Sequence, residues 1–109
     1  MVRVDRLASV LRSEISSILS KKINDSRIGF ISITEIKISK DMTQAQVYYS
    51  QFGSEEDKLK TKKGLQSASP FIQSELFKVI NIQIIPKIHF QFDPSIERGV
   101  DLVNKINEL

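Results

Sequence analysis

The sequence contains no cysteine, and this absence removes several kinds of chemistry at once. Disulfide bonds, thiolate metal sites and cysteine nucleophiles are excluded, and nothing argues for an oxidising compartment. No apolar run approaches the ~20 residues that a helix needs to cross a bilayer. Arg3 and Arg6 flank no uninterrupted apolar stretch of the kind that a signal peptide requires. We therefore expect a cytoplasmic protein that does not enter a membrane.

The recurring signatures of catalytic sites are missing as well. There is no glycine-rich phosphate loop, no G-x-S-x-G, no H-E-x-x-H and no serine–histidine pair with an obvious orienting acid. His89 is the only histidine, and without a second histidine or a cysteine it predicts no metal site. Asp41 and Asp93 occur in turn sequences, where carboxylates accept hydrogen bonds from nearby backbone N–H groups. We expect no enzyme, no cofactor and no small-molecule substrate.

The composition is that of one globular domain spanning residues 1–109, with 40% hydrophobic and 27% charged residues. A chain of this length buries roughly 65% of its unfolded-state surface, enough to form a core without crosslinks. The net charge is +3 and the pI is about 9.3. Residues 1–66 hold the positive excess, with twelve Lys and Arg against eight Asp and Glu. This mild basic bias is compatible with a nucleic-acid partner.

The spacing of apolar residues divides the chain into helices and strands. Residues 4–23 have one apolar stripe at helical spacing and predict an amphipathic helix. Residues 30–38 alternate with a change of phase, which predicts a strand with a bulge or with both faces covered at one end. Residues 44–50 alternate cleanly, so the two strands should pair as an antiparallel hairpin. A third strand is predicted at 87–92, and a short helix from Ile96 onward.

Residues 65–80 are the stretch around which the chain is organised. Their apolar residues recur every three or four positions, which indicates a helix with one buried stripe. Pro70 lies inside this pattern, lacks an N–H and clashes with the preceding turn. We therefore predict two helices meeting at a bend, with Ser69 as N-cap and Pro70 as first residue of the second. The first of them should begin at Ser54, with Asp57 as its capping-box partner.

This order of elements predicts an α+β domain of two layers, with helices on one face of a three-stranded sheet. Together with specific residues, the order resembles the ribosome-binding factor A family of bacterial assembly factors. The resemblance begins with Arg-Val-Asp-Arg-Leu at residues 3–7 and continues through Asp-Ser-Arg-Ile at 25–28. It includes the strand segments within 34–50 and ends with residues 86–95. Ala68, Ser69 and Pro70 fall on the family's kink between two helices.

The resemblance implies a type II KH-like fold, written α-β-β-α-kink-α-β plus a short C-terminal helix. In this family an Ala-x-Gly kink replaces the Gly-x-x-G loop of true KH domains. The chain departs from the pattern in having Pro70 in place of that glycine, Gln73 where an arginine is usual, and Lys87 where an acid is common. The missing arginine removes a phosphate-binding side chain at the kink.

In function, the resemblance implies a non-catalytic factor that binds the free or immature 30S small ribosomal subunit and its rRNA. Such a factor assists late maturation and processing of 16S rRNA, matters most in the cold, and leaves the finished particle. We expect it to be a monomer. The alternative is an α+β module for protein contact or small-ligand binding, in which the basic residues serve only solubility.

The candidate RNA-binding residues are the basic side chains of the expected helices and of the first strand and its turn. Any one of them is more simply part of a solvated surface, and Glu56 is placed to pair with Lys60 at i,i+4. As a set they are candidates for phosphate contacts. The set comprises Arg3, Arg6, Arg12, Lys21, Lys22, Lys37, Lys40, Lys58, Lys60, Lys62, Lys63 and Lys78.

Aromatic residues offer a second kind of RNA contact. Tyr48 and His89 are expected on the exposed sheet face, where they could stack on unpaired bases or be ordinary strand residues. The six phenylalanines are most simply explained as core residues. They are Phe30, Phe52, Phe71, Phe77, Phe90 and Phe92.

Overall fold

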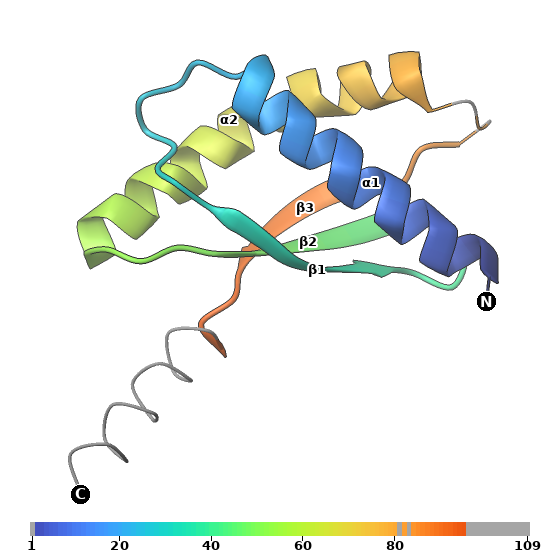
Figure 1. The fold of residues 1–109 in the computed structure, drawn as a ribbon, viewed down its shortest axis with the longest axis horizontal. Coiled ribbons are helices and arrows are strands. Elements are labelled where there is room, and N and C mark those ends of the chain that lie inside the picture. Colours follow the sequence, from blue (N-terminus) through green and yellow to red (C-terminus); the bar gives the residue numbers. More distant parts are fainter. Residues whose placement is uncertain (1, 81, 83, 96–109) are drawn as a thin grey trace, which may run out of the picture.

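The computed structural model describes residues 2–80, 82 and 84–95. In chain order its elements are α1 (Val2–Lys21), β1 (Ser32–Ile38), β2 (Gln44–Ser50), α2 (Glu55–Val79) and β3 (Lys87–Phe92). Both helices lie on the same face of the sheet (Figure 1). The expected two-layer α+β arrangement is therefore confirmed, while the predicted helix from residue 96 lies outside the described residues.

The three strands form one sheet in the order β1-β2-β3. β1 and β2 pair antiparallel, and their register shifts between Ile33 and Glu35. This shift is the bulge that the change of phase in the sequence predicted. β2 and β3 pair parallel, because the chain crosses over through α2 before it returns to the sheet.

The core lies between the sheet and the apolar stripes of the two helices. Leu11 and Ile15 of α1 are completely buried, as are Ala45 and Val47 of β2. This burial confirms the amphipathic helix predicted for residues 4–23 and the inward face of the second strand. α2 contributes the other side of the core through Ala68, Ile72 and Leu76, and its Leu65 is also completely buried.

α2 begins as the sequence predicted. The backbone N–H of Asp57 donates to Ser54 Oγ at 3.1 Å, and the N–H of Ser54 donates to Asp57 Oδ2 at 3.4 Å. Together these two contacts complete a capping box. They satisfy two backbone donors, one at the cap and one in the first turn, that would otherwise have no partner in the helix.

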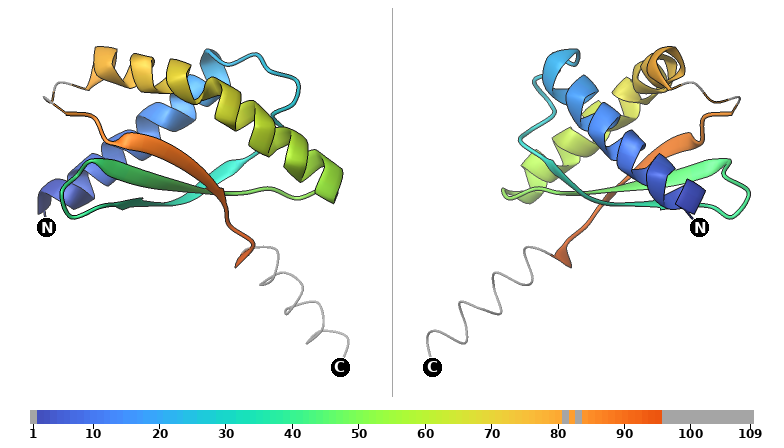
Figure 2. Two further views of the ribbon diagram at one scale, coloured as in Figure 1. Left: turned by 180° about the vertical axis from the view of Figure 1, so that it is seen from behind. Right: turned by 45° about the vertical axis from the view of Figure 1, so that its right-hand side comes forward.

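The predicted division of this segment into two helices is wrong. α2 runs without interruption from Glu55 to Val79 with Pro70 in its interior. Ser69 is not an N-cap, because its hydroxyl donates to the carbonyl of Leu65 at 2.8 Å. The proline ring and this serine contact both favour a bend, and the ribbon of α2 changes direction in its middle (Figure 2). The chain therefore bends at the predicted place without leaving the helical conformation.

Burial of both halves of α2 explains how the helix tolerates Pro70. An interior proline costs ~3 kcal/mol or more in an isolated helix, but most helical stability in proteins comes from packing of the apolar face. Leu65 lies before the proline and Ile72 and Leu76 after it, and all three are completely buried. The bend keeps one continuous apolar stripe against the sheet.

Gln73 connects the second half of α2 to β3. Its Nε2 donates to the carbonyl of Pro86 at 2.8 Å, and its Oε1 accepts from the N–H of Ile88 at 3.0 Å. Because β3 is an edge strand, these contacts satisfy backbone groups that point away from β2. The glutamine at this position is therefore a structural residue.

The expectation that all six phenylalanines are core residues is wrong for four of them. Phe90 packs against the core, and Phe92 contacts Tyr49 edge-on with ring centroids 5.9 Å apart. The other four are exposed at the surface and are not among the residues that pack in the core. Their exposed fractions are 92% for Phe30, 62% for Phe52, 43% for Phe71 and 56% for Phe77.

A close contact joins the first half of α2 to the segment between α1 and β1. Thr61 is completely buried, and its Oγ1 accepts from the N–H of Gly29 at 3.0 Å and donates to the carbonyl of Arg27 at 3.4 Å. Gly64 lies one turn further along α2, and a Cβ there would lie 2.6 Å from Cγ1 of Ile28. The glycine therefore permits the approach, although it weakens the helix.

The Gly64→Ala variant tests this contact. We expect its free energy of unfolding to fall by up to about 2 kcal/mol, because overpacking costs about 1–3 kcal/mol and the better helix former returns only about 1 kcal/mol. Urea unfolding measures the change, with Gln66→Ala on the exposed side of α2 as control. A Gly64→Ala protein more stable than the wild type would show that Ile28 moves aside without cost.

Candidate nucleic-acid interface

The structure divides the predicted RNA-binding residues into two groups. One group has partners within the protein, and the other is exposed with no ion-pair or hydrogen-bond partner among the described residues. The first group comprises Arg12, Lys22, Lys37, Lys58, Lys60 and Lys78. The second comprises Arg6, Lys21, Lys40, Lys62 and Lys63. Arg3 lies in α1, but its side chain is outside the described part of the chain.

Glu75 accounts for two members of the first group. The residue is 6% exposed, and its carboxylate binds the ammonium groups of Lys22 at 2.6 Å and Lys78 at 3.0 Å. The hydrogen bond from Lys22, followed by that from Lys78, lowers the pKa of Glu75 below its ordinary 4.5 despite the opposing effect of burial. Lys22 therefore joins the end of α1 to α2, and both lysines neutralise a buried acid.

Arg12 also has a structural contact. Its Nη2 donates to the carbonyl of Ile33 at 2.7 Å, which connects α1 to β1. Ile33 lies at the bulge, where the ladder between β1 and β2 is interrupted. The arginine therefore supplies a donor to a carbonyl at an irregular point of the edge strand.

The lysines in the first half of α2 are partly neutralised by neighbouring acids. Lys60 lies 3.4 Å from Glu56, which confirms the pair predicted from the sequence. Lys58 lies 3.6 Å from Glu55, and its ammonium is 5.1 Å from the centre of the Phe92 ring. Lys62 and Lys63 remain available to an outside partner.

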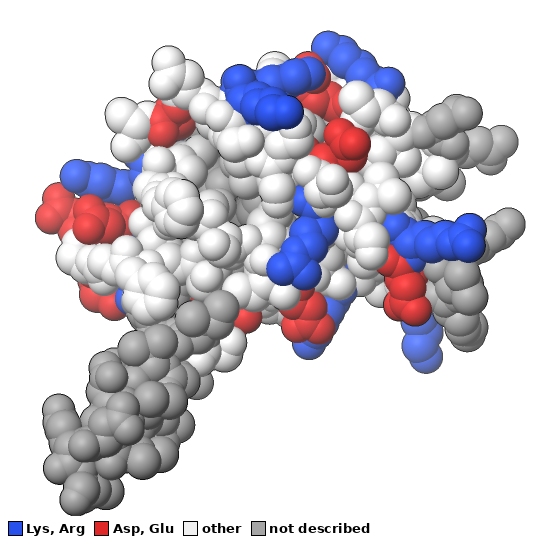
Figure 3. Space-filling model, viewed as in Figure 1, with Lys and Arg blue, Asp and Glu red and all other residues white. Residues whose placement is uncertain are grey.

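The distribution of charge over the surface is mixed. On the face shown in Figure 3, basic and acidic side chains lie beside one another, and no continuous basic area covers that face. The predicted basic residues therefore form no single patch on that face. The exposed cations without partners are the candidate phosphate contacts.

The bend of α2 borders a cleft of about 500 Å³ between this helix and the start of β3. Ser69 and Pro70 line it together with Lys87, whereas Ala68 is buried in the core. Lys87 is exposed, and its side chain has no partner among the described residues. Of the three kink residues, Ala68 therefore packs in the core, whereas Ser69 and Pro70 form part of the cleft wall.

Tyr48 and His89 lie on the sheet face away from the helices and are half-buried. The ammonium of Lys37 is 5.4 Å from the centre of the Tyr48 ring. His89 Nε2 lies 2.6 Å from Gln44 Oε1, so its ring is held by a residue of the neighbouring strand.

No metal site and no membrane span are found in the part of the chain that the structure describes. No three His, Cys, Asp or Glu side chains there are grouped so that they could hold a metal ion. None of the described helices combines the length and the apolar character that a membrane span requires.

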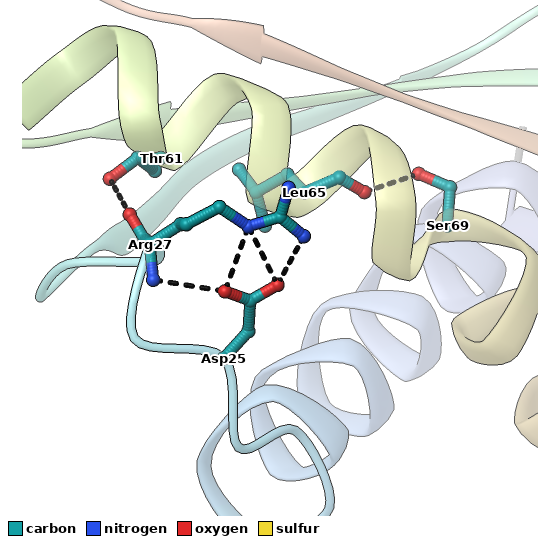
Figure 4. A network of polar contacts seen from close by, with 5 residues as sticks. All are labelled: Asp25, Arg27, Thr61, Leu65 and Ser69. Carbon is teal, nitrogen blue, oxygen red and sulfur yellow. Dashed lines mark hydrogen bonds and ion pairs between the residues drawn. The ribbon is translucent and has the colours of Figure 1, made fainter.

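Arg27 is a functional candidate that the sequence analysis missed. Its Nε donates to Asp25 Oδ1 at 3.0 Å and its Nη2 to Asp25 Oδ2 at 2.6 Å (Figure 4). These hydrogen bonds raise the pKa of Arg27 and lower that of Asp25. The Asp-Ser-Arg sequence was the available signal, because an aspartate in such a turn often accepts the N–H two residues on, as it does here at 2.9 Å.

Residues 3–106 match the model of the ribosome-binding factor A family. A ribosome-binding factor A from Dictyoglomus thermophilum is 46% identical over 98% of this chain and 90% of its own length. Another from Acetivibrio thermocellus is 41% identical over 99% of this chain and 89% of its own.

Two sets of coordinates from relatives have a similar fold. The solution structure of a Thermotoga maritima protein described as a ribosome binding factor A is 26% identical, with a TM-score of 0.73, and the alignment covers 82% of this chain and 85% of that one. A homology model of the Thermus thermophilus ribosome binding factor A, fitted into a cryo-EM map of a 30S complex with that protein, is 21% identical with a TM-score of 0.60. Its alignment covers 84% of this chain and 91% of that one.

The buried Glu75 predicts a pH dependence of stability. Because its pKa is lower in the folded state, its contribution is present above pH 4.5 and is lost as the pH falls through the lowered value. Urea unfolding between pH 7 and pH 3 should therefore show a loss of stability that Glu75→Gln reduces. Glu55→Gln, which alters an exposed carboxylate, is the control and should leave the pH profile unchanged. An unchanged profile in Glu75→Gln would contradict the assignment.

Proposed function

The chain belongs to the ribosome-binding factor A family, and from this membership we propose that it binds the free or immature small ribosomal subunit. There it assists late maturation and processing of 16S rRNA and leaves the finished particle. It acts as a monomer in the cytoplasm, without catalysis and without a small-molecule substrate. The observation that carries the proposal is the 46% identity to a named family member over 98% of the chain.

The exposed cations without partners supply the means of binding RNA. Arg6 and Lys21 lie towards opposite ends of α1, Lys40 lies in the turn between β1 and β2, and Lys62 and Lys63 lie in α2. Contacts of this kind position a protein on the phosphate backbone without reading its sequence. The rigid two-layer fold holds these positions apart, so the shape of the folded rRNA determines which of them engage.

Binding to small subunits should weaken steeply with salt. Each phosphate contact releases counterions, so the binding constant falls as salt rises. In a plot of its logarithm against the logarithm of the salt concentration, each contact makes the slope more negative by about 0.9, a value taken from duplex DNA. Co-sedimentation with purified small subunits at several salt concentrations measures the slope. Binding that does not depend on the salt concentration would instead support a protein-contact module in which the basic residues serve only solubility.

The double variant Lys62→Glu with Lys63→Glu tests the unpartnered lysines of α2. We expect weaker binding to small subunits and a salt slope smaller by about 1.8, which corresponds to two lost phosphate contacts. The thermal melt should stay nearly unchanged, because both side chains are exposed. Lys62→Arg with Lys63→Arg keeps the charge and should bind as the wild type does. A large loss of stability in the glutamate variant would show that these lysines are structural.

A further inference from the structure

Two of the exposed phenylalanines border one small cleft. Phe30 is 92% exposed and Phe52 is 62% exposed, and both line a cleft of about 310 Å³. We call it the Phe30–Phe52 cleft. Neither ring contacts another aromatic ring within the described part of the chain. The volume of the cleft lies at the lower end of the range for ligand pockets, and two large apolar side chains exposed at one cleft make it a candidate binding site.

The backbone beside each ring is held in place. Phe30 follows Gly29, whose N–H donates to the buried Thr61 at 3.0 Å. Phe52 follows the buried Gln51 and precedes Gly53, whose φ of 142° is favourable only for glycine. The two rings are therefore presented from anchored connecting segments, so little backbone order has to be gained when a ligand binds.

Gln51 supplies an unpaired polar group at the same cleft. The residue is 4% exposed, lines the cleft, and its Oε1 has no hydrogen-bond partner. Its Nε2 lies 2.7 Å from where a Cβ at residue 29 would be, so a side chain at residue 29 would displace the amide from this position. A buried acceptor without a partner requires an explanation. Rotation of the terminal amide toward the cleft would let Oε1 accept a hydrogen bond from a ligand.

The other walls of the cleft are polar and carry both signs of charge. Arg27 is held by Asp25, and Lys60 pairs with Glu56 at 3.4 Å. The carboxylate of Asp57, which accepts from the N–H of Ser54, also lines the cleft. Charge alone therefore does not select an anion here. What the site offers is two exposed phenylalanine rings at its rim, an amide, and a guanidinium held by Asp25.

We propose that the Phe30–Phe52 cleft binds an unpaired RNA base, with the phenylalanine rings stacking on bases and the Gln51 amide contacting a base edge. Stacking on aromatic side chains and hydrogen bonding to base edges is how proteins recognise single-stranded RNA. A protein partner fits less well, because the cleft between the two rings is polar and charged residues are depleted at the centre of protein interfaces. The inference rests on the proposed function and specifies which part of the rRNA this surface contacts.

Substitution of the two rings tests the proposal with purified small ribosomal subunits and with a single-stranded adenosine hexamer as probes. We expect Phe30→Ala and Phe52→Ala each to weaken binding between about 5- and 150-fold, the range for loss of one stacked base. Leucine at either position should also weaken binding, because it keeps the apolar surface and loses the aromatic face. Phe77→Leu alters an exposed phenylalanine of α2 that does not line this cleft and should bind as the wild type does.

These variants separate failure of this inference from failure of the proposed function. If the wild-type protein binds small subunits and the leucine variants bind equally well, base stacking is overturned while ribosome binding stands. If leucine preserves binding and alanine abolishes it, the surface contacts an apolar protein partner, which also overturns the inference. If the wild type does not bind small subunits at all, the proposed function fails, and the hexamer still tests the cleft.

A fluorescent variant gives a direct measure of stacking. The chain has no tryptophan, so Phe30→Trp introduces a single indole at the rim of the cleft. We expect its emission to be quenched by the single-stranded hexamer and much less by a fully paired duplex of the same length. Quenching of equal size by both, or by neither, would overturn the proposal. Phe77→Trp is the matched control and should respond to neither probe.

Discussion

Burial of one apolar stripe along α2, on both sides of Pro70, is the constraint on which the rest of the structure depends. Leu65 and Ile72 are completely buried although a proline separates them. The bend at Ser69 and Pro70 allows the apolar residues on both sides of the proline to stay buried. The parallel β3 strand follows from this arrangement, because α2 carries the chain across the sheet.

The same packing determines what the charged residues can do. Where α2 meets the end of α1, the carboxylate of Glu75 is buried, and a buried charge needs partners. Lys22 and Lys78 meet that need and are therefore less available to bind phosphate. Lys62 and Lys63 face solvent on the same helix and have no such role. The surroundings of each lysine thus determine whether it neutralises an acid within the protein or remains exposed to solvent. The amino-acid composition does not contain this information.

Features governed by neighbours in the chain could be predicted from the sequence. The capping box of Ser54, the pair between Glu56 and Lys60 and the bulge of β1 all depend on residues a few positions apart. The exposure of Phe30 and the unpaired amide of Gln51 could not be predicted. They depend on contacts between residues 27–29, the end of β2 and α2, which are distant in sequence.

The sequence by itself determined the α+β class, the order of the strands and helices apart from the continuity of α2, and the position of the bend, because periodicity and proline act locally. Specific residues spread along the chain determined the family. Only the tertiary structure decided that the helix stays continuous through Pro70. It also decided which cations are neutralised and which aromatic rings remain outside the core. The physical reason is that burial and ion pairing depend on residues that are distant in sequence and close in the folded molecule. The type of a residue limits the interactions that it can form, and its neighbours in the folded protein determine which of them it forms.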